Sequence, residues 1–355
     1  MSQNEVVSSF NQSGGSIMSN IKVLGIDLAK DVFQLHGTDA KGKKVLSKRL
    51  SRAKLTKYMG TLSPCLVGLE ACGSSHYWAR VFREQGHTVK MMAPQFVKPY
   101  VKSNKNDSRD AEGIAEAVTR PTMRFVPIKN REQQDLLLLH RVRELSMKQR
   151  TAQGNQIRGL LAEYGVIVPK GIAHLARLPE LLEEESSKLT PAAQRVFIQL
   201  YEQFKMYMKQ VEDYEHQIEH HAAHDPRCIA LQEIEGIGPI TASALVASIS
   251  DPGVFKNGRE VSAWIGLVPR QFSSGNKVLL GGIGKRGDRY LKKLLIHGGR
   301  SVVRTCEKKT DRKSEWVKDK LQRGGFNKAS VAVANKNARV VWALLATGEC
   351  YRKTV

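Results

Sequence analysis

Three short runs with strand-like patterning open the structured part of the chain. Residues 21–29 (IKVLGIDLA) are apolar and rich in β-formers, and residues 31–39 and 43–50 have roughly alternating polarity. Turn-forming residues separate the runs, and a strand places successive side chains on opposite faces, so this pattern predicts three strands in a meander.

Helical and strand patterns alternate after the meander. A helix is predicted near Lys54–Met59, a fourth strand at 65–71 (CLVGLEA) and a helix near His76–Gln85. A fifth strand at 87–94 and a helix in 106–117 (NDSRDAEGIAEA) follow. This order of elements predicts an α/β RNase H-like fold for residues 21–128.

A heptad pattern dominates the middle of the chain, and we expect a helical coiled-coil region at 129–225. A weaker helical pattern covers Gln133–Tyr164, a candidate for an antiparallel partner or a dimer arm. The seam alone leaves open a coiled coil between subunits or an ordinary helical hairpin within one subunit. The seam positions are Ala193, Phe197, Leu200, Phe204, Tyr207, Val211, Tyr214, Ile218 and His221.

The length of the chain indicates how many domains it forms, and its charge indicates the kind of partner it binds. With 355 residues and 41% hydrophobic positions, the chain can form two or three domains. Its formal net charge of +22 favours a polyanionic partner, and nucleic acid is the first candidate. The charge is +12 over residues 1–150, −5 over 151–250 and +15 over 251–355. This distribution predicts two nucleic-acid surfaces joined by an element that does not bind.

The cysteines and the N-terminal residues exclude several classes. Five cysteines are scattered without a C-x-x-C pair, which disfavours a zinc ribbon or a disulfide scaffold. The chain lacks a signal-like N-terminus and any stretch of about 18 apolar residues. We therefore expect a cytoplasmic protein with no membrane association. We also expect residues 1–20 to be a flexible extension before the structured part of the chain.

Four carboxylates on the predicted elements form a candidate metal site. Asp27 ends the first strand and Glu70 ends the fourth, and these strands are neighbours in an RNase H-like sheet. Asp107 and Asp110 are three residues apart on a predicted helix and share one face. Carboxylates held this close need cations, and two Mg²⁺ ions suit phosphodiester chemistry. For Asp107 alone, a helix N-cap is the equally plausible role.

The last region, residues 226–355, is expected to be mainly α-helical. The segment IEGIGPITASAL predicts a helix-hairpin-helix in which Gly236 and Gly238 permit a turn whose N–H groups can meet a phosphate; a glycine helix stop without ligand is the alternative. Ser273 and Ser274 precede Gly275 in a predicted loop, where a serine is a candidate nucleophile or a turn former.

Basic residues flank that loop and form a candidate nucleic-acid surface. Most of them open an amphipathic helix whose opposite face is leucine-rich, so they are either backbone contacts to nucleic acid or a solvated charged face. The candidates are Arg270, Lys277, Lys285, Arg286, Arg289, Lys292 and Lys293.

Histidines near residue 220 have a spacing that permits metal chelation. His216, His220 and His224 are four residues apart in HQIEHHAAH. No third ligand type or acidic base of an H-E-x-x-H arrangement accompanies them, so a polar helix end is the favoured interpretation.

The motifs together resemble a known family, the DEDD transposases of bacterial insertion sequences, family 110 and its 1111 subgroup of bridge-RNA-guided recombinases. The resemblance covers nearly everything after Ile21. Each motif is weak alone, and together they are specific: GIDLAK, GLEACG, NDSRDA, IEGIGPITA, IGLVPRQFSSGNK, GGIGKRGDRYLKKLL and ANKNARVVWALL.

The resemblance implies a function and a site. It implies a RuvC-like N-terminal domain whose tetrad is Asp27, Glu70, Asp107 and Asp110, with Mg²⁺ as the cofactor. It also implies a C-terminal serine, Ser274 with Ser273 as the fallback, that attacks DNA to form a phosphoserine link. The implied partners are donor and target DNA, a structured bridge RNA and further copies of the chain, in a dimer or tetramer with a site composed across subunits.

Two other functions stay open at this level. A RuvC-like junction nuclease would use the metal site to activate water, and Ser274 would then be structural. A nucleic-acid-binding protein with a vestigial site would account for the charge alone.

Overall fold

The computed structural model describes residues 20–102, 107–275, 277–284 and 286–352. The extension predicted at 1–20 lies, except for Asn20, outside these ranges. Contacts divide the chain into two compact units, Met1–Arg131 and Glu132–Val355. The first predicted domain ends close to this division, and the predicted regions 129–225 and 226–355 share the second unit. None of the helices within the described ranges combines the length and the apolar character that a membrane-spanning segment needs.

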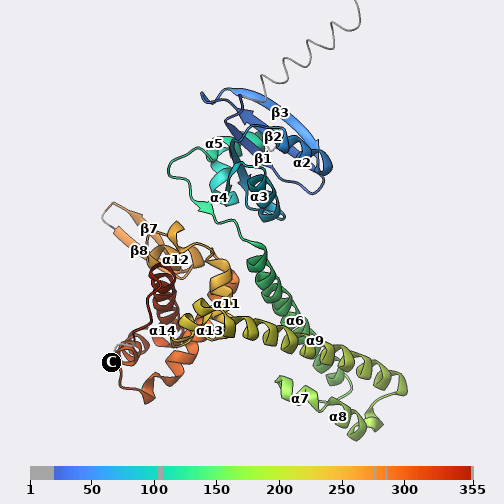
Figure 1. The fold of residues 1–355 in the computed structure, drawn as a ribbon. Coiled ribbons are helices and arrows are strands. Elements are labelled where there is room, and N and C mark those ends of the chain that lie inside the picture. The colour runs from blue at the N-terminus through green and yellow to red at the C-terminus, as the bar shows by residue number, and fades with distance from the viewer. Residues whose placement is uncertain (1–19, 103–106, 276, 285, 353–355) are drawn as a thin grey trace, which may run out of the picture. The chain divides into compact units, whose positions relative to one another are not determined.

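The first unit is built on a mixed six-stranded sheet with the order β3-β2-β1-β4-β5-β6. Figure 1 labels the first three of these strands, β1, β2 and β3. The β1–β2–β3 meander is antiparallel, and β4 pairs in parallel with both β1 and β5. The predicted RNase H-like order of elements is confirmed, including the neighbouring first and fourth strands. The strands are β1 (Val23–Asp27), β2 (Val32–Thr38), β3 (Lys44–Ser51), β4 (Leu66–Glu70), β5 (Thr88–Met92) and β6 (Phe125–Val126).

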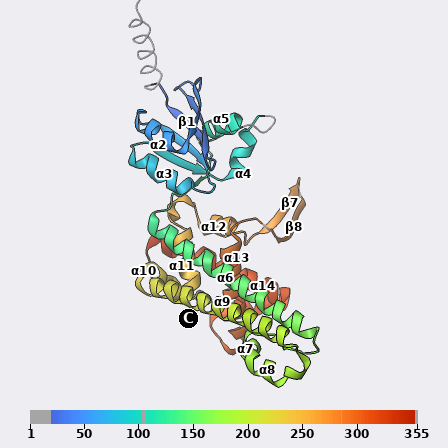
Figure 2. The ribbon, with the colours of Figure 1, turned by 90° about the vertical axis from the view of Figure 1, so that its right-hand side faces the viewer.

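Helices cover both faces of this sheet (Figure 2). On one face, α2 (Arg52–Gly60) and α3 (Ser75–Glu84) bury Met59 and Trp78 against Leu24 and Ile26 of β1. On the other face, α5 (Asp107–Ala117) packs Ile114 against a second apolar cluster, beside the short α4 (Pro94–Val97) and η1 (Lys98–Tyr100). Successive residues of a strand point to opposite faces of the sheet. Alternate residues of β1 therefore face the two cores.

The second unit opens with two long helices that run antiparallel. In α6 (Arg131–Ala162) and α9 (Pro191–His224), Arg143 Nε donates to Glu215 at 2.9 Å and Ser146 Oγ donates to Gln210 at 3.2 Å. Gln153 Nε2 donates to the carbonyl of Leu200 at 3.3 Å. The partner residue number falls as the α6 number rises, which defines the antiparallel direction.

The heptad seam of α9 is buried within the chain. Phe197, Phe204, Val211 and Ile218, each seven residues apart, are all at most 3% exposed. Their neighbours come from α6, from the small helices α7 (Ile172–Ala176) and α8 (Leu178–Glu184), and from elsewhere in this unit. The structure thus has the helical hairpin of one subunit, and this seam is not free to pair with another chain.

Shorter helices and one long helix complete the second unit. The α10–α11 pair, α13 and α14 share one apolar core with α12. The helix α14 changes direction at Gly325, which has a φ of 74°. The helices are α10 (Pro226–Gln232), α11 (Pro239–Ser248), α12 (Gly258–Ile265), α13 (Arg289–Thr305) and α14 (Arg312–Thr347), with short 3-10 turns η2 (Ser186–Lys188), η3 (Pro252–Val254) and η4 (Cys306–Lys308).

A two-stranded hairpin interrupts this region, which was predicted to be mainly α-helical. The strands β7 (Pro269–Ser274) and β8 (Lys277–Ile283) pair antiparallel, with Ser274 opposite Lys277. The prediction of a loop at Ser273 and Ser274 is wrong: both residues end a strand, and the turn begins only at Gly275, which has a φ of 56°. Every described residue of both strands is exposed.

A buried histidine joins three helices of the second unit. His140 of α6 is 1% exposed, and its ring nitrogens lie 2.9 Å from Tyr290 Oη of α13 and 3.0 Å from Ser243 Oγ of α11. Burial, followed by the positive charges of Arg143 and His221, lowers the pKa of His140 to about 4. A neutral imidazole can donate at one nitrogen and accept at the other, which suits two hydroxyl partners.

This pKa makes stability depend on pH. The unfolded chain protonates His140 below its ordinary pKa of 6.5, whereas the folded protein does so only near pH 4, so stability falls as pH drops through this window. Between pH 7 and pH 5, the wild type should lose about 2 kcal/mol more unfolding free energy than His140→Gln. Urea titrations at both values measure this. His174→Gln, at an exposed imidazole, should keep the wild-type pH dependence, and a His140→Gln that also keeps it contradicts the prediction.

Candidate metal centre and serine hairpin

Three aspartates from two elements of the first unit converge. Asp27 ends β1, and Asp107 and Asp110 lie in the first turn of α5. Carboxylate oxygens of these three residues lie within 4.8 Å of one another. Asp27 and Asp110 are half-buried and Asp107 is exposed. The predicted i, i+3 pair therefore projects toward the end of β1.

Two glycines bring α5 against the sheet. A Cβ atom on Gly25 would lie 2.2 Å from the carbonyl oxygen of Ala111 and 2.5 Å from the backbone nitrogen of Ala115. Gly68, its partner on β4, would place a Cβ 2.9 Å from Val118 Cβ. The missing side chains form a shallow trough in which the α5 backbone lies. Neither glycine was predicted to have this role, although glycine inside a strand is the signal of such an approach.

Alternation along the strands then fixes the direction of the acidic residues. Asp27 is two residues beyond Gly25, and Glu70 is two residues beyond Gly68, so both acidic residues share the glycine face. That face carries α5. The close backbone approach thus sets the distance between the strand carboxylate and the two helical ones.

Glu70 lies on the same face but outside the cluster of three aspartates. The pKa of the nearby Cys72 thiol is raised, first by partial burial of the sulfur and then by the negative charges of Glu70 and Asp27. Glu70 and Asp27 therefore act on the same surroundings. The structure brings three of the four predicted ligands together and places the fourth at the end of the neighbouring strand.

The donor set of the three aspartates fits a hard divalent cation. Mg²⁺ binds oxygen at about 2.0–2.1 Å in octahedral geometry, so two oxygens on one ion lie roughly 3–4 Å apart. The carboxylate oxygens of the aspartate cluster lie within 4.8 Å of one another, a limit that is compatible with this separation. Three carboxylates at such distances repel one another unless a cation neutralises them. Asp27, Asp107 and Asp110 are therefore the residues that would hold a metal.

Ser274 lies at the tip of the β7–β8 hairpin in the second unit. It is exposed, and it lines a shallow depression with Ser273, Lys277, Val278 and other hairpin residues. The hydroxyl of Ser273 accepts a hydrogen bond from Gln271 Nε2 at 2.9 Å. Arg270 and Lys277 are exposed on the same hairpin, and Lys277 is paired opposite Ser274.

Some of the basic residues predicted near the start of α13 are exposed, and others bond to groups of the same chain. Arg286 and Arg289 are exposed, and α13 begins at Arg289 after the N-cap Asp288. The ammonium of Lys292 donates to the carbonyls of Gly284 and Arg286, at 3.0 and 2.7 Å, and thereby holds the segment between hairpin and helix. Lys293 is paired with Glu144 at 2.8 Å. Lys285 lies outside the described residues.

In the segment predicted to be a helix-hairpin-helix, α10 and α11 lie on either side of a turn. Gly236 has a φ of 87°, and a Cβ there would lie 2.7 Å from the carbonyl oxygen of Gly298 in α13. Packing within the chain thus accounts for glycine at this position. Gly238 is exposed at the N-terminus of α11.

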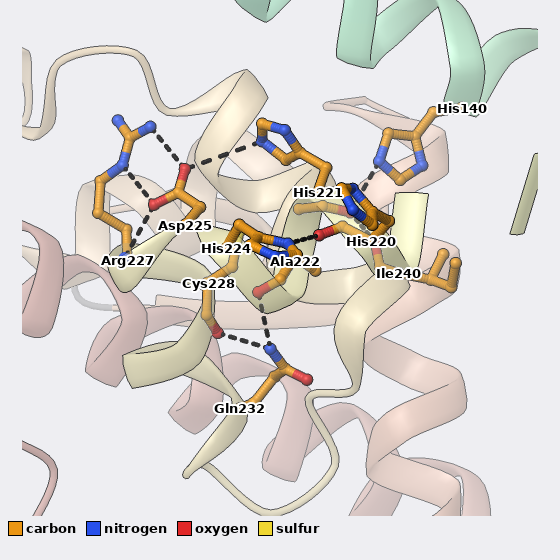
Figure 3. A network of polar contacts seen from close by, with 11 residues as sticks. His140, His220, His221, Ala222, His224, Asp225, Arg227, Cys228, Gln232 and Ile240 are labelled. Atoms are coloured by element: carbon orange, nitrogen blue, oxygen red, sulfur yellow. Dashed lines mark hydrogen bonds and ion pairs between the residues drawn. The ribbon is translucent and has the colours of Figure 1, made fainter. Parts of the chain in front are cut away.

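The histidines near residue 220 form a polar helix end rather than a metal site (Figure 3). His224 Nδ1 lies 2.7 Å from the carbonyl oxygen of His220, and Asp225 caps α10 and pairs with Arg227. Among the described residues, the groups suited to a metal include the aspartates above and no histidine. The favoured interpretation from sequence agrees with this arrangement.

An RNase H-like sheet with acidic residues at strand ends and on the adjoining helix defines the class of metal-dependent DEDD phosphoryl-transfer enzymes. Residues 24–166 match the family of DEDD enzymes of the IS110 type described as "Transposase". Residues 228–315 match the family described as "Transposase IS116/IS110/IS902 family". The matches cover the aspartate cluster in one unit and the serine hairpin in the other.

Whole-length relatives agree with these matches. A probable family 20 transposase of Pseudomonas aeruginosa is 48% identical over 94% of this chain and 99% of its own length. The transposase for insertion sequence element IS1111A of Coxiella burnetii is 46% identical over 94% and 92%, respectively. The chain belongs to the IS110 family of DEDD transposases, enzymes of DNA transposition. Membership implies a divalent metal, which the aspartate cluster suits.

Proposed function

We propose that this transposase cuts and exchanges DNA strands through a covalent phosphoserine link on Ser274, with Asp27, Asp107, Asp110 and Glu70 holding two Mg²⁺ ions in a RuvC-like domain. The observation that carries the proposal is the aspartate cluster in one matched family region, together with an exposed serine among cations in the other. When bound, the ions supply charge neutralisation and activation of the attacking oxygen.

The serine chemistry balances without any further reactant. Ser274 Oγ forms a bond to phosphorus and loses its proton, the bond from phosphorus to a deoxyribose oxygen breaks, and that oxygen takes up a proton. Reversal of the same steps joins a new strand. A serine hydroxyl is a weak nucleophile, and no histidine is close to Ser274 in sequence, so activation by the acidic centre is the route we favour. Arg270 and Lys277 would hold the phosphate beside the serine.

Guidance by a structured RNA accounts for the two basic ends of the chain. Base pairing would select the DNA sequence, while the protein contacts phosphates and helical shape. The net charges of +12 and +15 on either side of an acidic middle support two binding surfaces. In the C-terminal one, the proposed contacts are Arg286 and Arg289, the turn at Gly236 and Gly238, and Lys285.

A dimer or tetramer would bring an acidic centre and a serine together from different copies. The α9 seam is occupied within the chain, so another surface must serve as the interface. On α6, Leu138 and Leu145 are seven residues apart and are 57% and 56% exposed. Such a stripe on a long helix suits pairing with a second copy.

A second candidate function is a metal-dependent junction nuclease that uses water. The observation in its favour is that the three aspartates assemble within the first unit without any residue of the second. In this case Ser274 would be a structural residue of the hairpin.

A denaturing-gel assay for covalent protein–DNA adducts separates the two functions. With end-labelled DNA carrying the ends of the insertion sequence, the guide RNA and Mg²⁺, the wild type should give an adduct that Ser274→Ala lacks and Ser273→Ala retains. Cleavage by Ser274→Ala, with no adduct from the wild type, would instead establish the water-using nuclease. Loss of the adduct only in Ser273→Ala would move the nucleophile to that residue.

A further inference from the structure

A groove of about 1170 Å³ lies in the second unit, away from Ser274. Its walls are the start of α12, the base of the β7–β8 hairpin at Pro269 and Ile283, and one face of α14. The α14 face includes residues of the segment ANKNARVVWALL, a motif that neither the acidic cluster nor the serine uses.

The groove is lined by cations without matching carboxylates. Its basic residues are exposed, and none pairs with a carboxylate in the part of the chain that the structure describes. Elsewhere in the same unit, comparable lysines are neutralised: Lys293 pairs with Glu144, and Lys309 pairs with Glu235. No acidic residue is among the described residues that line the groove, which are Arg259, Lys328, Lys336 and Arg339 together with polar and apolar positions. This charge pattern fits a polyanion.

Aromatic residues hold the groove in shape without neutralising its charge. The ammonium of Lys336 lies 4.5 Å from the centre of the Trp316 ring, a cation–π contact that positions the charge and leaves it intact. Trp342 Nε1 donates to the carbonyl of Pro252 at 3.1 Å, which fixes that ring in the wall. A Cβ on Gly258 would lie 2.7 Å from the Arg339 carbonyl oxygen, so α12 and α14 touch and close the floor.

We propose that this groove binds an unpaired strand of nucleic acid through its phosphates. A duplex keeps its bases paired and turned inward, so it would present only its backbone to the apolar wall of the groove. A single strand can place phosphates against Lys336 and Arg339 and its bases against apolar wall residues such as Val331 and Ala332. The inference rests on the proposed function only in taking nucleic acid to be the partner.

Substituting two groove cations tests the proposal in the full-length protein. Lys336→Gln with Arg339→Gln should weaken binding of a fluorescein-labelled single strand of about 15 nucleotides by about tenfold or more. The slope of log affinity against log salt should fall by roughly 1.4, since each lost phosphate contact on a single strand removes about 0.7. Affinity for a blunt duplex of the same sequence should change less than about twofold. Anisotropy titrations with RNA and DNA strands show which strand type the groove takes.

Matched controls keep the result specific. Arg195→Gln with Lys209→Gln removes the same charge from exposed positions of α9 and should leave single-strand affinity unchanged. Ala332→Trp fills the groove at constant charge and should reproduce the loss, with thermal melting to confirm folding. Unchanged affinity for both RNA and DNA strands in the groove variant, or an equal loss for the duplex or in the α9 control, overturns the proposal. Because the assay needs neither cleavage nor Mg²⁺, it can succeed where the phosphoserine chemistry fails.

Discussion

Replacing Asp27 by Asn is expected to slow DNA strand cleavage about 1000-fold or more, which corresponds to about 4 kcal/mol of lost transition-state stabilisation. Asp27 lies on the sheet, and its carboxylate is close to both aspartates of α5. Its negative charge would therefore help to hold any cation that the cluster binds. The amide has the same shape as the carboxylate and keeps the packing. Gel assays of cleavage, with DNA affinity measured in parallel, separate a catalytic loss from a binding loss, and affinity should change less than about twofold.

A nearby aspartate provides the control. Asp31 is exposed in the turn before β2, and its backbone carbonyl, rather than its side chain, accepts from the Arg52 amide. Asp31→Asn removes the same charge close by and should cleave at the wild-type rate. Added Mg²⁺ should raise the melting temperature of the wild type more than that of Asp27→Asn, because a ligand that binds the folded state stabilises it. Normal cleavage by Asp27→Asn would show that the cluster is not the catalytic centre.

Most of the first unit can be predicted from the sequence because its strands have contrasting patterns. The order of elements places the first and fourth strands side by side, and both strands have acidic ends, so the sequence alone assigns Asp27 and Glu70 to one region. Helical spacing adds Asp107 and Asp110. The distances among them cannot be predicted in this way, because they depend on the close approach at Gly25 and Gly68, which involves backbone atoms far apart in the chain.

The second unit is harder to predict for a physical reason. The heptad pattern locates the seam of α9 correctly. Such a seam can pack against a helix of another chain or of the same chain, and in this structure α6 of the same chain packs against α9. The β7–β8 hairpin escapes prediction because its residues are exposed on both faces, so no buried alternation marks it. Phe272 and Val278 are 58% and 68% exposed, a surface that suits contact with another chain or nucleic acid.

Replacing Gly25 by Ala is expected to damage both stability and activity, although it adds one methyl group. The new Cβ would lie 2.2 Å from the Ala111 carbonyl oxygen, and the obstructing atoms are backbone, so no side-chain rotation can relieve the clash. The helix α5 must move outward, at a cost of about 1–3 kcal/mol typical of overpacking. Because α5 carries Asp107 and Asp110, the aspartate cluster opens, and a displacement near 1 Å should reduce cleavage about 100-fold.

Two further glycines make this prediction specific to the trough. Gly73→Ala adds a methyl where nothing lies within 4 Å, so its melting temperature and cleavage should stay near wild type. Gly68→Ala meets the side chains of Val118 and Ile114, at 2.9 and 3.1 Å, which can adjust in part; its losses should be intermediate, and it remains testable if Gly25→Ala does not fold. Melting curves and cleavage rates for the three variants should rank as Gly73, Gly68, Gly25 in increasing damage. If Gly25→Ala matched Gly73→Ala, the close seating of α5 would not be what holds the aspartates together.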